Sequence, residues 1–218
     1  MRALKTFLTR NKHFYLLTLL IPILLWFEYL EMTQVPQYMI HSPLDDKIPL
    51  VPAFAVFYLL WFPYVAYGLL YTGLHSRTDF CRLVLFLAGG MSIACTVYTL
   101  FPNAQDLRPA VTAADPFSAV LRFIYSVDSP TNVCPSIHVI NAIGIDAALR
   151  HSEVFAEKKF RKHASFLLMT LICLSTVLIK QHSVIDAMCG ILTACLLCFP
   201  LYVLPEIKTK RRSSSQYV

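Results

Sequence analysis

Six blocks of apolar residues, of which the fourth and fifth are short, constrain this chain more than any other feature of its sequence. An α-helix needs about 20 apolar residues to cross the hydrocarbon core of a bilayer. Charged residues make up only 15% of the chain, where soluble domains average about a quarter. We therefore predict an all-α, polytopic membrane protein in which one transmembrane domain, 1–218, forms a core bundle of six transmembrane helices and 205–218 is a cytoplasmic tail. The predicted spans are 14–32, 50–72, 83–101, 135–149, 165–179 and 184–204.

The basic residues are distributed unevenly over the segments between these blocks. Only Lys47, Arg108, Arg122 and Lys180 lie in one alternating set of segments, and the other fifteen of the nineteen basic residues lie in the other set. Because Lys and Arg collect in cytoplasmic loops, this asymmetry predicts a multi-pass protein of the cell membrane with both termini in the cytoplasm. Basic segments that face membrane lipids explain the net charge of +6, so no nucleic-acid partner is expected.

Two histidines carry the chemistry that the sequence indicates. His182 and Asp186 are four residues apart, so on a helix the carboxylate lies one turn from the imidazole and accepts its proton, which suits a histidine nucleophile. His138 follows a proline and Ser136 at the predicted start of a helix, where unpaired backbone N–H groups bind anions. Together these patterns indicate phosphoryl chemistry. By the alternation of the loops, both histidines and Arg108 fall on the extracytoplasmic face.

The motif residues resemble the type 2 phosphatidic acid phosphatase superfamily, whose members are integral membrane enzymes with a six-helix core. The family pattern is Lys-x6-Arg-Pro, then Pro-Ser-Gly-His, then Ser-Arg-x5-His-x3-Asp. The resemblance covers the stretch from about 101 to 186 by motif and the whole chain by the number of predicted spans. The matching residues are Arg108 and Pro109, then Pro135, Ser136 and His138, then Ser175, His182 and Asp186.

The resemblance implies a role for each residue of the site. His182 would attack phosphorus and form a phosphohistidine, while Asp186 would orient its ring and stabilise the developing charge. His138 would protonate the leaving oxygen. Arg108, Ser136 and backbone N–H groups would hold the non-bridging phosphate oxygens. The resemblance implies no metal and no other cofactor.

Three positions depart from the family pattern. Phe101 stands in place of the lysine, Thr176 in place of the arginine and Ile137 in place of the glycine, so two of the three usual cations are missing. Lys180, two residues before His182, is the only nearby basic candidate to replace one of them as a phosphate ligand, with a snorkelling anchor at the membrane boundary as the alternative. Gln105 or Gln181 could instead donate neutral hydrogen bonds. Similar losses are implied for the branch that includes inositol phosphorylceramide and sphingomyelin synthases. The motifs of this chain look closer to that branch than to the soluble phosphatases.

These observations predict a membrane lipid phosphatase that hydrolyses a lipid phosphate or diphosphate at the extracytoplasmic face. One alternative is a lipid phosphotransferase that moves a phospho-headgroup between lipids, as the inositol phosphorylceramide and sphingomyelin synthases do. Another is a non-catalytic membrane protein or a transporter with the same fold. The substrate lipid and the oligomeric state stay open.

Three further features receive structural interpretations. We interpret Asp146 and Arg150, four residues apart, as a local ion pair. Glu28 and Glu31 are interpreted as interfacial residues, with a place at the border of a substrate entrance as the alternative. The apolar stretch 117–127 is expected to form a short amphipathic helix along the membrane interface.

Overall fold

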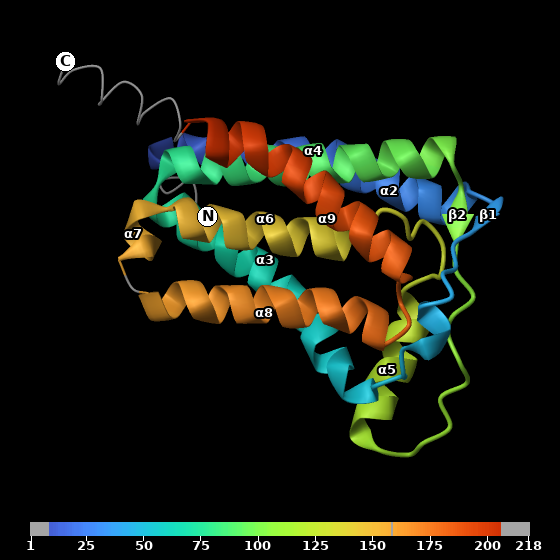
Figure 1. Cartoon of the computed structure of the whole chain (residues 1–218). Helices are drawn as coiled ribbons and strands as arrows, with labels where there is room; N and C mark the ends of the chain where they lie inside the picture. Colours follow the sequence, from blue (N-terminus) through green and yellow to red (C-terminus); the bar gives the residue numbers. More distant parts are fainter. Residues whose placement is uncertain (1–8, 158, 206–218) are drawn as a thin grey trace.

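The computed structural model of the chain describes residues 9–157 and 159–205 and is a bundle of helices (Figure 1). Two short strands, β1 (Tyr38–Met39) and β2 (Asn103–Ala104), pair in parallel and are the only strands in these residues. The prediction of an all-α helical bundle is therefore confirmed. The helical segments are η1 (Lys12–Leu19), α2 (Leu20–Thr33), η2 (Asp45–Lys47), η3 (Pro52–Phe54), α3 (Ala55–His75), α4 (Arg77–Leu100), α5 (Pro116–Val127), α6 (Ile137–His151), α7 (Glu153–Ala156), α8 (Lys159–Leu178), α9 (Val184–Cys198) and η4 (Phe199–Val203).

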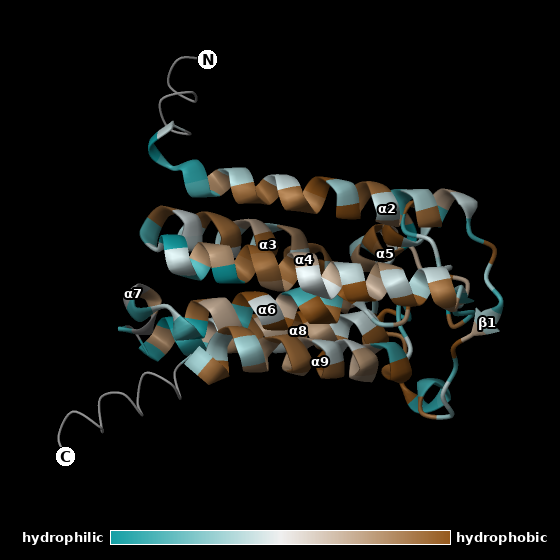
Figure 2. Ribbon diagram, turned by 90° about the horizontal axis from the view of Figure 1, so that it is seen from above, coloured by the Kyte–Doolittle hydropathy of each residue, from teal (hydrophilic) through white to brown (hydrophobic). Residues whose placement is uncertain are grey.

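Five helical segments are long and apolar enough to cross a membrane, and they indicate a multi-pass membrane protein. They coincide with five of the six predicted blocks, with shifts of a few residues at their ends. The remaining block forms α6, which has 15 residues. Figure 2 shows hydrophobic residues along the helices and the more hydrophilic residues toward the ends of the bundle. The five long segments are Lys12–Thr33, Pro52–His75, Arg77–Leu100, Lys159–Leu178 and Val184–Val203.

The short helix α6 lies inside the bundle, packed against α3, α4, α8 and α9. Ten of its 15 residues are buried. Glycines let the neighbouring helices approach it closely: a Cβ at Gly144 would lie 2.2 Å from the ring of Phe86 on α4, and one at Gly68 on α3 would lie 2.7 Å from Ile145. Small residues at helix contacts are typical of membrane bundles. The first turn of α6, which holds His138, is therefore enclosed by other helices.

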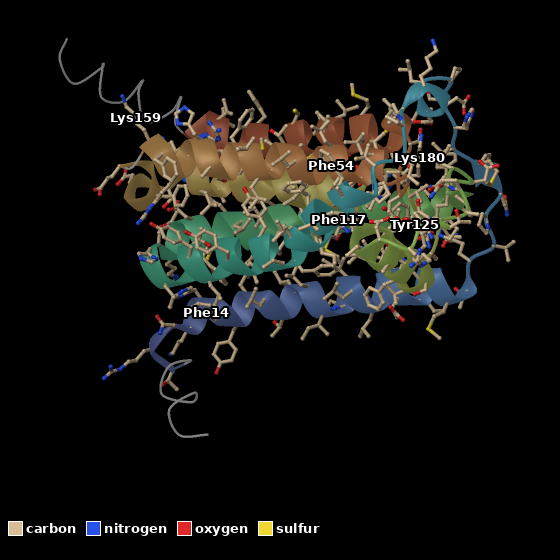
Figure 3. All side chains as sticks on the ribbon, turned by 90° about the horizontal axis from the view of Figure 1, so that it is seen from below. Phe14, Phe54, Phe117, Tyr125, Lys159 and Lys180 are labelled. Carbon is tan, nitrogen blue, oxygen red and sulfur yellow. The ribbon has the colours of Figure 1, made fainter. Side chains whose placement is uncertain are left out.

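The two ends of the bundle hold different structures (Figure 1). One end, which we call the site end, holds α5, β1, β2 and the loops that follow α2, α4, α5 and α8. The other, which we call the terminal end, holds α7 and both the first and the last described residues. Figure 3 shows Lys180 and Tyr125 at the site end and Lys159 at the terminal end.

Paired loops at the site end fix the segment that leads into α6. Because β1 and β2 pair in parallel, the loop after α2 lies along the loop after α4. The Asn103 side chain of β2 accepts hydrogen bonds from the backbone N–H groups of Val133 and Cys134, both at 2.9 Å. Ser136 then begins the helix as its N-cap, with its hydroxyl accepting from the N–H of Val139. Serine is among the residues favoured at this position.

Candidate functional site

The start of α9 places His182 directly before a helix whose first turn is capped. Ser183 is the N-cap: its hydroxyl accepts from the N–H of Ile185 at 3.1 Å, and its own N–H donates to the Asp186 carboxylate at 2.8 Å. This reciprocal arrangement is a capping box. Asp186 is fully buried. Its carboxylate is therefore held in place by the helix start, next to His182.

One oxygen of the Asp186 carboxylate lies 3.5 Å from Nδ1 of His182. That distance allows an ion pair when the ring is protonated, but the geometry is not that of a hydrogen bond. Nδ1 of His182 and Oδ1 of Asp186 are both buried without a hydrogen-bond partner among the described residues. Catalytic hydrogen bonds are often long in the absence of substrate. Since Nδ1 faces the carboxylate, Nε2 is the ring nitrogen left for chemistry.

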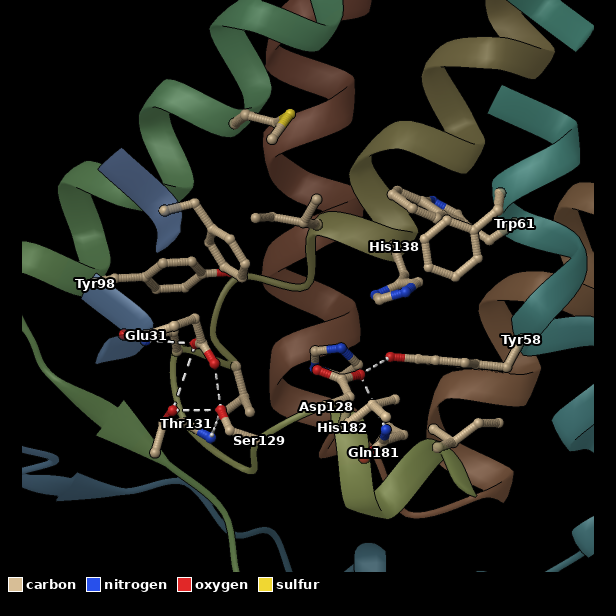
Figure 4. A pocket seen from close by; sticks show the side chains of 18 of the residues that line it. Glu31, Tyr58, Trp61, Tyr98, Asp128, Ser129, Thr131, His138, Gln181 and His182 are labelled. Atoms are coloured by element: carbon tan, nitrogen blue, oxygen red, sulfur yellow. Dashed lines mark hydrogen bonds between the residues drawn. The ribbon is translucent and has the colours of Figure 1, made fainter. Parts of the chain in front are cut away.

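His138 lies in the first turn of α6 and faces His182 across a cavity (Figure 4). The centroids of the two imidazole rings are 5.9 Å apart. The His138 ring stacks on the ring of Tyr58 at 4.3 Å and lies 4.6 Å from the ring of Trp61, and both aromatic residues come from α3. The bundle thus brings together two histidines that lie far apart in the sequence.

The cavity between the histidines has a volume of about 260 Å³. Its walls come from α2, α3, α4, α5 and α6, together with loop residues before α6 and before α9. Leu24, Phe62 and Val127 line it and are also 50%, 57% and 66% exposed. These apolar side chains of α2, α3 and α5 mark the place where the cavity meets the outer surface of the bundle.

Arg108 lines the same cavity, and its guanidinium is anchored to the C-terminal end of α5. Its terminal nitrogens donate to the backbone carbonyls of Asp128 at 2.8 Å and Ser129 at 3.0 Å, and the group lies 4.9 Å from the Tyr125 ring centroid. Cations are stabilised at helix C-termini. Burial lowers the pKa of Arg108 from its ordinary value. Nearby acidic groups raise this pKa and so partly oppose the effect of burial. The Nε of Arg108 is buried without a hydrogen-bond partner among the described residues.

Ser136 does not line the cavity. Its hydroxyl is engaged as the N-cap of α6, the residue is fully buried, and its backbone N–H donates to the carbonyl of Asp186 at 3.1 Å. This bond joins the first turn of α6 to the first turn of α9. Ser136 therefore holds His138 and His182 in their relative positions, and we do not assign its hydroxyl a contact with phosphate.

Lys180 lies close to His182 in the chain, but its ammonium group is directed away from the cavity. Its Nζ donates to the backbone carbonyls of Asp45 and Ile48, at 2.5 Å and 2.6 Å, in the loop between α2 and α3. Lys180 itself has a positive φ of 58° and does not line the cavity. The position of Lys180 gives no support to the expectation that it replaces a missing phosphate-binding cation, because two of its three donors already bind carbonyls.

Asp45 is part of the site region although no sequence pattern pointed to it. Its carboxylate, in a residue only 1% exposed, accepts from the Ser183 hydroxyl at 2.6 Å and from the Val184 N–H at 2.8 Å. A carboxylate at a helix N-terminus satisfies unpaired N–H groups and interacts favourably with the helix dipole. Asp45 thus caps α9 from a distant loop and, together with Lys180, holds the turn that carries His182. No local signal around residue 45 indicates a helix that begins 139 residues later.

Asp128 is a second residue that the sequence patterns did not indicate, and it lines the cavity. It is the C-cap of α5, and its carboxylate accepts from the Tyr58 hydroxyl and from the Gln181 amide, the latter at 3.0 Å (Figure 4). Tyr58 stacks on His138, and Gln181 directly precedes His182. Asp128 therefore connects the residue that stacks on His138 to the residue that precedes His182.

Of the two glutamates near the end of α2, Glu31 lines the cavity and Glu28 does not. The Glu31 carboxylate accepts from the hydroxyls of Ser129 and Thr131 and from the Asn132 amide, the last at 2.6 Å (Figure 4). Glu28 is exposed. Glu31 therefore lies in the wall of the cavity, whereas Glu28 lies on the surface of the bundle.

The described residues contain no cluster of three or more His, Cys, Asp or Glu side chains that could hold a metal ion. No family model, no curated protein and no solved structure matches the chain. A functional assignment therefore depends on the geometry of the cavity and on the motif residues themselves.

Proposed function

We propose that this protein is an integral membrane lipid phosphatase that hydrolyses a lipid phosphate or diphosphate through a phosphohistidine. The observation that carries the proposal is the pair of imidazole rings, 5.9 Å apart across one cavity, with the Asp186 carboxylate 3.5 Å from Nδ1 of His182. A nucleophile, an orienting carboxylate and a general acid are thereby assembled in one enclosed place. Covalent phosphoryl transfer needs these three parts.

The first chemical step forms a bond between Nε2 of His182 and phosphorus and breaks the bond between phosphorus and the leaving oxygen. Asp186 stabilises the positive charge that develops on the ring. His138 gives its proton to the leaving oxygen. In the second step water attacks phosphorus, His138 takes a proton from that water, and the N–P bond breaks to release phosphate and the free histidine.

Donors around the cavity serve the non-bridging phosphate oxygens. Arg108, which lines the cavity, is one, and the backbone N–H groups at the start of α6 are others, since the first N–H groups of a helix have no partner within it. Ile137 and His138 of that first turn both line the cavity. Electrostatic stabilisation of the equatorial oxygens is a major part of phosphoryl-transfer catalysis.

The proposed enzyme crosses the cell membrane six times, with α6 as the fourth span in chain order, and has both termini in the cytoplasm. Arg77, Arg82 and Arg150 belong to the terminal end, which supports this orientation because basic residues collect on the cytoplasmic side. The site end then faces the extracytoplasmic side. Lipid substrate enters from the leaflet through the opening lined by Leu24, Phe62 and Val127.

A lipid phosphotransferase is the second candidate, and the same opening favours it. A cavity that opens toward the lipid side admits a lipid hydroxyl as readily as it admits the substrate, and that hydroxyl would replace water in the second step. The absence of two family cations at Phe101 and Thr176 is a further argument for this candidate.

The test uses purified protein in non-ionic detergent with EDTA and a panel of phosphatidic acid, phosphatidylglycerol phosphate and polyprenyl diphosphate. Free phosphate and newly formed phospholipid are both measured. His182→Ala is compared with His163→Ala, a matched control in which the histidine is exposed on α8 at the terminal end.

Phosphate release that is lost in His182→Ala and kept in His163→Ala supports the phosphatase. Transfer of a headgroup without release supports the phosphotransferase. Absence of turnover in both assays favours a non-catalytic protein or a transporter, and strict dependence on an added metal contradicts the mechanism.

A further inference from the structure

The cavity that holds the two histidines carries more acidic than basic charge. Apart from the histidines, its charged lining residues are Glu31, Asp128 and Arg108, two negative and one positive. Asp186, buried behind His182, adds another negative charge. A phosphate monoester carries roughly −1.5 to −2 at neutral pH. A lipid phosphate with no other charge would therefore enter a site of its own sign, where the low dielectric strengthens repulsion.

Neither cavity carboxylate forms an ion pair with a basic side chain in the part of the chain that the structure describes. The hydrogen bonds to Glu31 come from two hydroxyls and one amide, and those to Asp128 come from Tyr58 and Gln181, so all these donors are neutral. Arg108 binds the backbone carbonyl of Asp128. Both carboxylates are therefore held in fixed positions, and Arg108 is the one Lys or Arg among the described residues that line the cavity near them, so one negative charge remains that favours a cation from a ligand.

Aromatic rings form much of the remaining wall of the cavity. The face of an aromatic ring attracts an organic cation, and tryptophan does so most strongly. Quaternary ammonium ligands are recognised in proteins by cages of such rings. The aromatic lining residues are Phe27, Tyr58, Trp61, Phe62 and Tyr98.

We propose that the lipid bound here carries an amine or a quaternary ammonium group, positively charged, close to its phosphate. The phosphorus lies between His138 and His182, and the ammonium group lies against Glu31 and Asp128. The volume of about 260 Å³ suits a phosphate with a short amino alcohol, while the lipid chains remain in the opening beside Leu24. This inference rests on the proposed function, since it takes the histidines as the phosphate end of the cavity.

Two kinds of lipid share this chemistry. One is a phosphodiester lipid whose headgroup is an amino alcohol. The other is the phosphate monoester of a long-chain amino alcohol, in which the amine belongs to the lipid chain. Phosphatidic acid has the phosphate without the amine and is the reference ligand.

Binding is measured on the His182→Ala protein, which forms no phosphohistidine and leaves bound lipid intact. Short-chain phosphatidylethanolamine, the phosphate of a long-chain amino alcohol and phosphatidic acid are titrated in detergent, with tryptophan fluorescence as the signal because Trp61 lines the cavity. At least one amine lipid is expected to bind about tenfold tighter than phosphatidic acid. Phosphatidic acid that binds as tightly as both amine lipids overturns the proposal. The amine lipid that binds tighter identifies the source of the amine.

Charge removal at constant size then tests the two carboxylates. Glu31→Gln and Asp128→Asn are each expected to reduce the preference for the amine lipid by about fivefold or more. Glu28→Gln is the matched control, because Glu28 lies on the same helix, is exposed and does not line the cavity. A preference that survives both cavity variants contradicts the proposal. If one variant does not fold, the other variant and the comparison of lipids still decide.

Turnover by the unmodified protein separates this inference from the proposed function. Amine preference in binding without turnover of any lipid contradicts the phosphatase and leaves the ammonium subsite standing. Turnover of phosphatidic acid at least as efficient as that of the amine lipids contradicts the subsite and leaves the phosphatase standing.

Discussion

Asp186 and Asp146 each lie four residues from a basic side chain, yet their carboxylates differ in how completely they are hydrogen-bonded at the two ends of the bundle. At the terminal end, Oδ2 of Asp146 accepts from Nε of Arg150 at 2.6 Å, and Oδ1 accepts from the Ser165 hydroxyl at 2.7 Å. Ser165 is in turn bonded to the Tyr64 hydroxyl at 2.7 Å. The predicted ion pair is confirmed, and both carboxylate oxygens have partners.

At the site end, the same spacing leaves the pair incompletely bonded. Oδ1 of Asp186 and Nδ1 of His182 lack hydrogen-bond partners among the described residues, and the imidazole lines a cavity. Buried polar groups without partners reduce stability, and native proteins keep few of them. The terminal-end pair is bonded as a structural ion pair is, whereas the site-end pair keeps the unpartnered atoms that the proposed phosphohistidine chemistry needs.

The largest effect is expected for Asp186→Asn. Loss of the carboxylate removes the group that orients His182 and stabilises its charge, so kcat should fall on the order of 10² to 10⁴-fold. Stability should change little, because the asparagine oxygen still accepts from the Ser183 N–H. The measurement is kcat from phosphate release, with Asp146→Asn as the control that keeps its activity. If Asp186→Asn has a kcat near that of the unmodified protein, the site-end pair has no role in catalysis.

Asp45→Asn is expected to lower kcat by about 10- to 100-fold with KM within about twofold, because small displacements of a reacting group are costly in rate. Asp45 caps the helix that follows His182 but does not line the cavity, so substrate binding should be spared. Steady-state kinetics distinguish kcat from KM. Asp46→Asn is the control, because Asp46 is the neighbouring residue and is paired with His41 on the surface. An equal loss in both variants would contradict a positioning role for Asp45.

Asp146→Ala is expected to act on stability instead of catalysis. It leaves Arg150 and the Ser165 hydroxyl without their partner, which should reduce the free energy of unfolding by about 1 to 3 kcal/mol, at the lower end because the Arg150 side chain is 37% exposed. The midpoint of thermal unfolding in detergent reports this change. Activity per folded molecule should stay constant. A fall in kcat at unchanged stability would contradict a purely structural role for the Asp146 pair.

The smallest effect is a pH dependence of α5, the helix that ends at Asp128. Hydrogen bonds from Ser118 to the N-cap carboxylate of Asp115 are the main cause of its lowered pKa. Because the folded-state pKa lies below the unfolded value of about 3.9, this contribution is present above that pH and is lost as pH falls through the folded-state pKa. Amide hydrogen exchange in α5, corrected for its intrinsic rate, should therefore become faster in acid. Asp115→Asn keeps an uncharged cap, and an identical acid response in that variant would exclude Asp115 as the cause.

Local sequence predicted most of the helices but not all of their ends. The predicted span 83–101 begins at residue 83, whereas α4 begins six residues earlier, at Arg77. Its first turn is polar, and Ser76 caps it by accepting from the N–H of Asp79. An apolar block reports only the part of a helix that is hydrophobic, so polar first turns are missed. The expected helix at 117–127 is confirmed as α5.

Residues of the site were predictable only where the signal is local. The approach of His182 and Asp186 was predicted from their spacing, although His182 lies just before the N-cap of α9 and not on the helix. The direction of the Lys180 ammonium does not, because its carbonyl partners belong to residues 45 and 48. The same limit applies to Asp128, whose partners come from α3 and from the turn before α9.

The sequence by itself determined that this chain forms apolar helices, which of their ends carry basic charge, and that one carboxylate lies a turn from His182. These properties depend on composition and on helical spacing, both of which act over a few residues. Only the tertiary structure decided that His138 faces His182, that Lys180 binds a loop, and that Glu31 and Asp128 line the same cavity. The reason is that each of these contacts joins segments far apart in the sequence, whose distance apart is set by the packing of the helices and loops and not by local spacing.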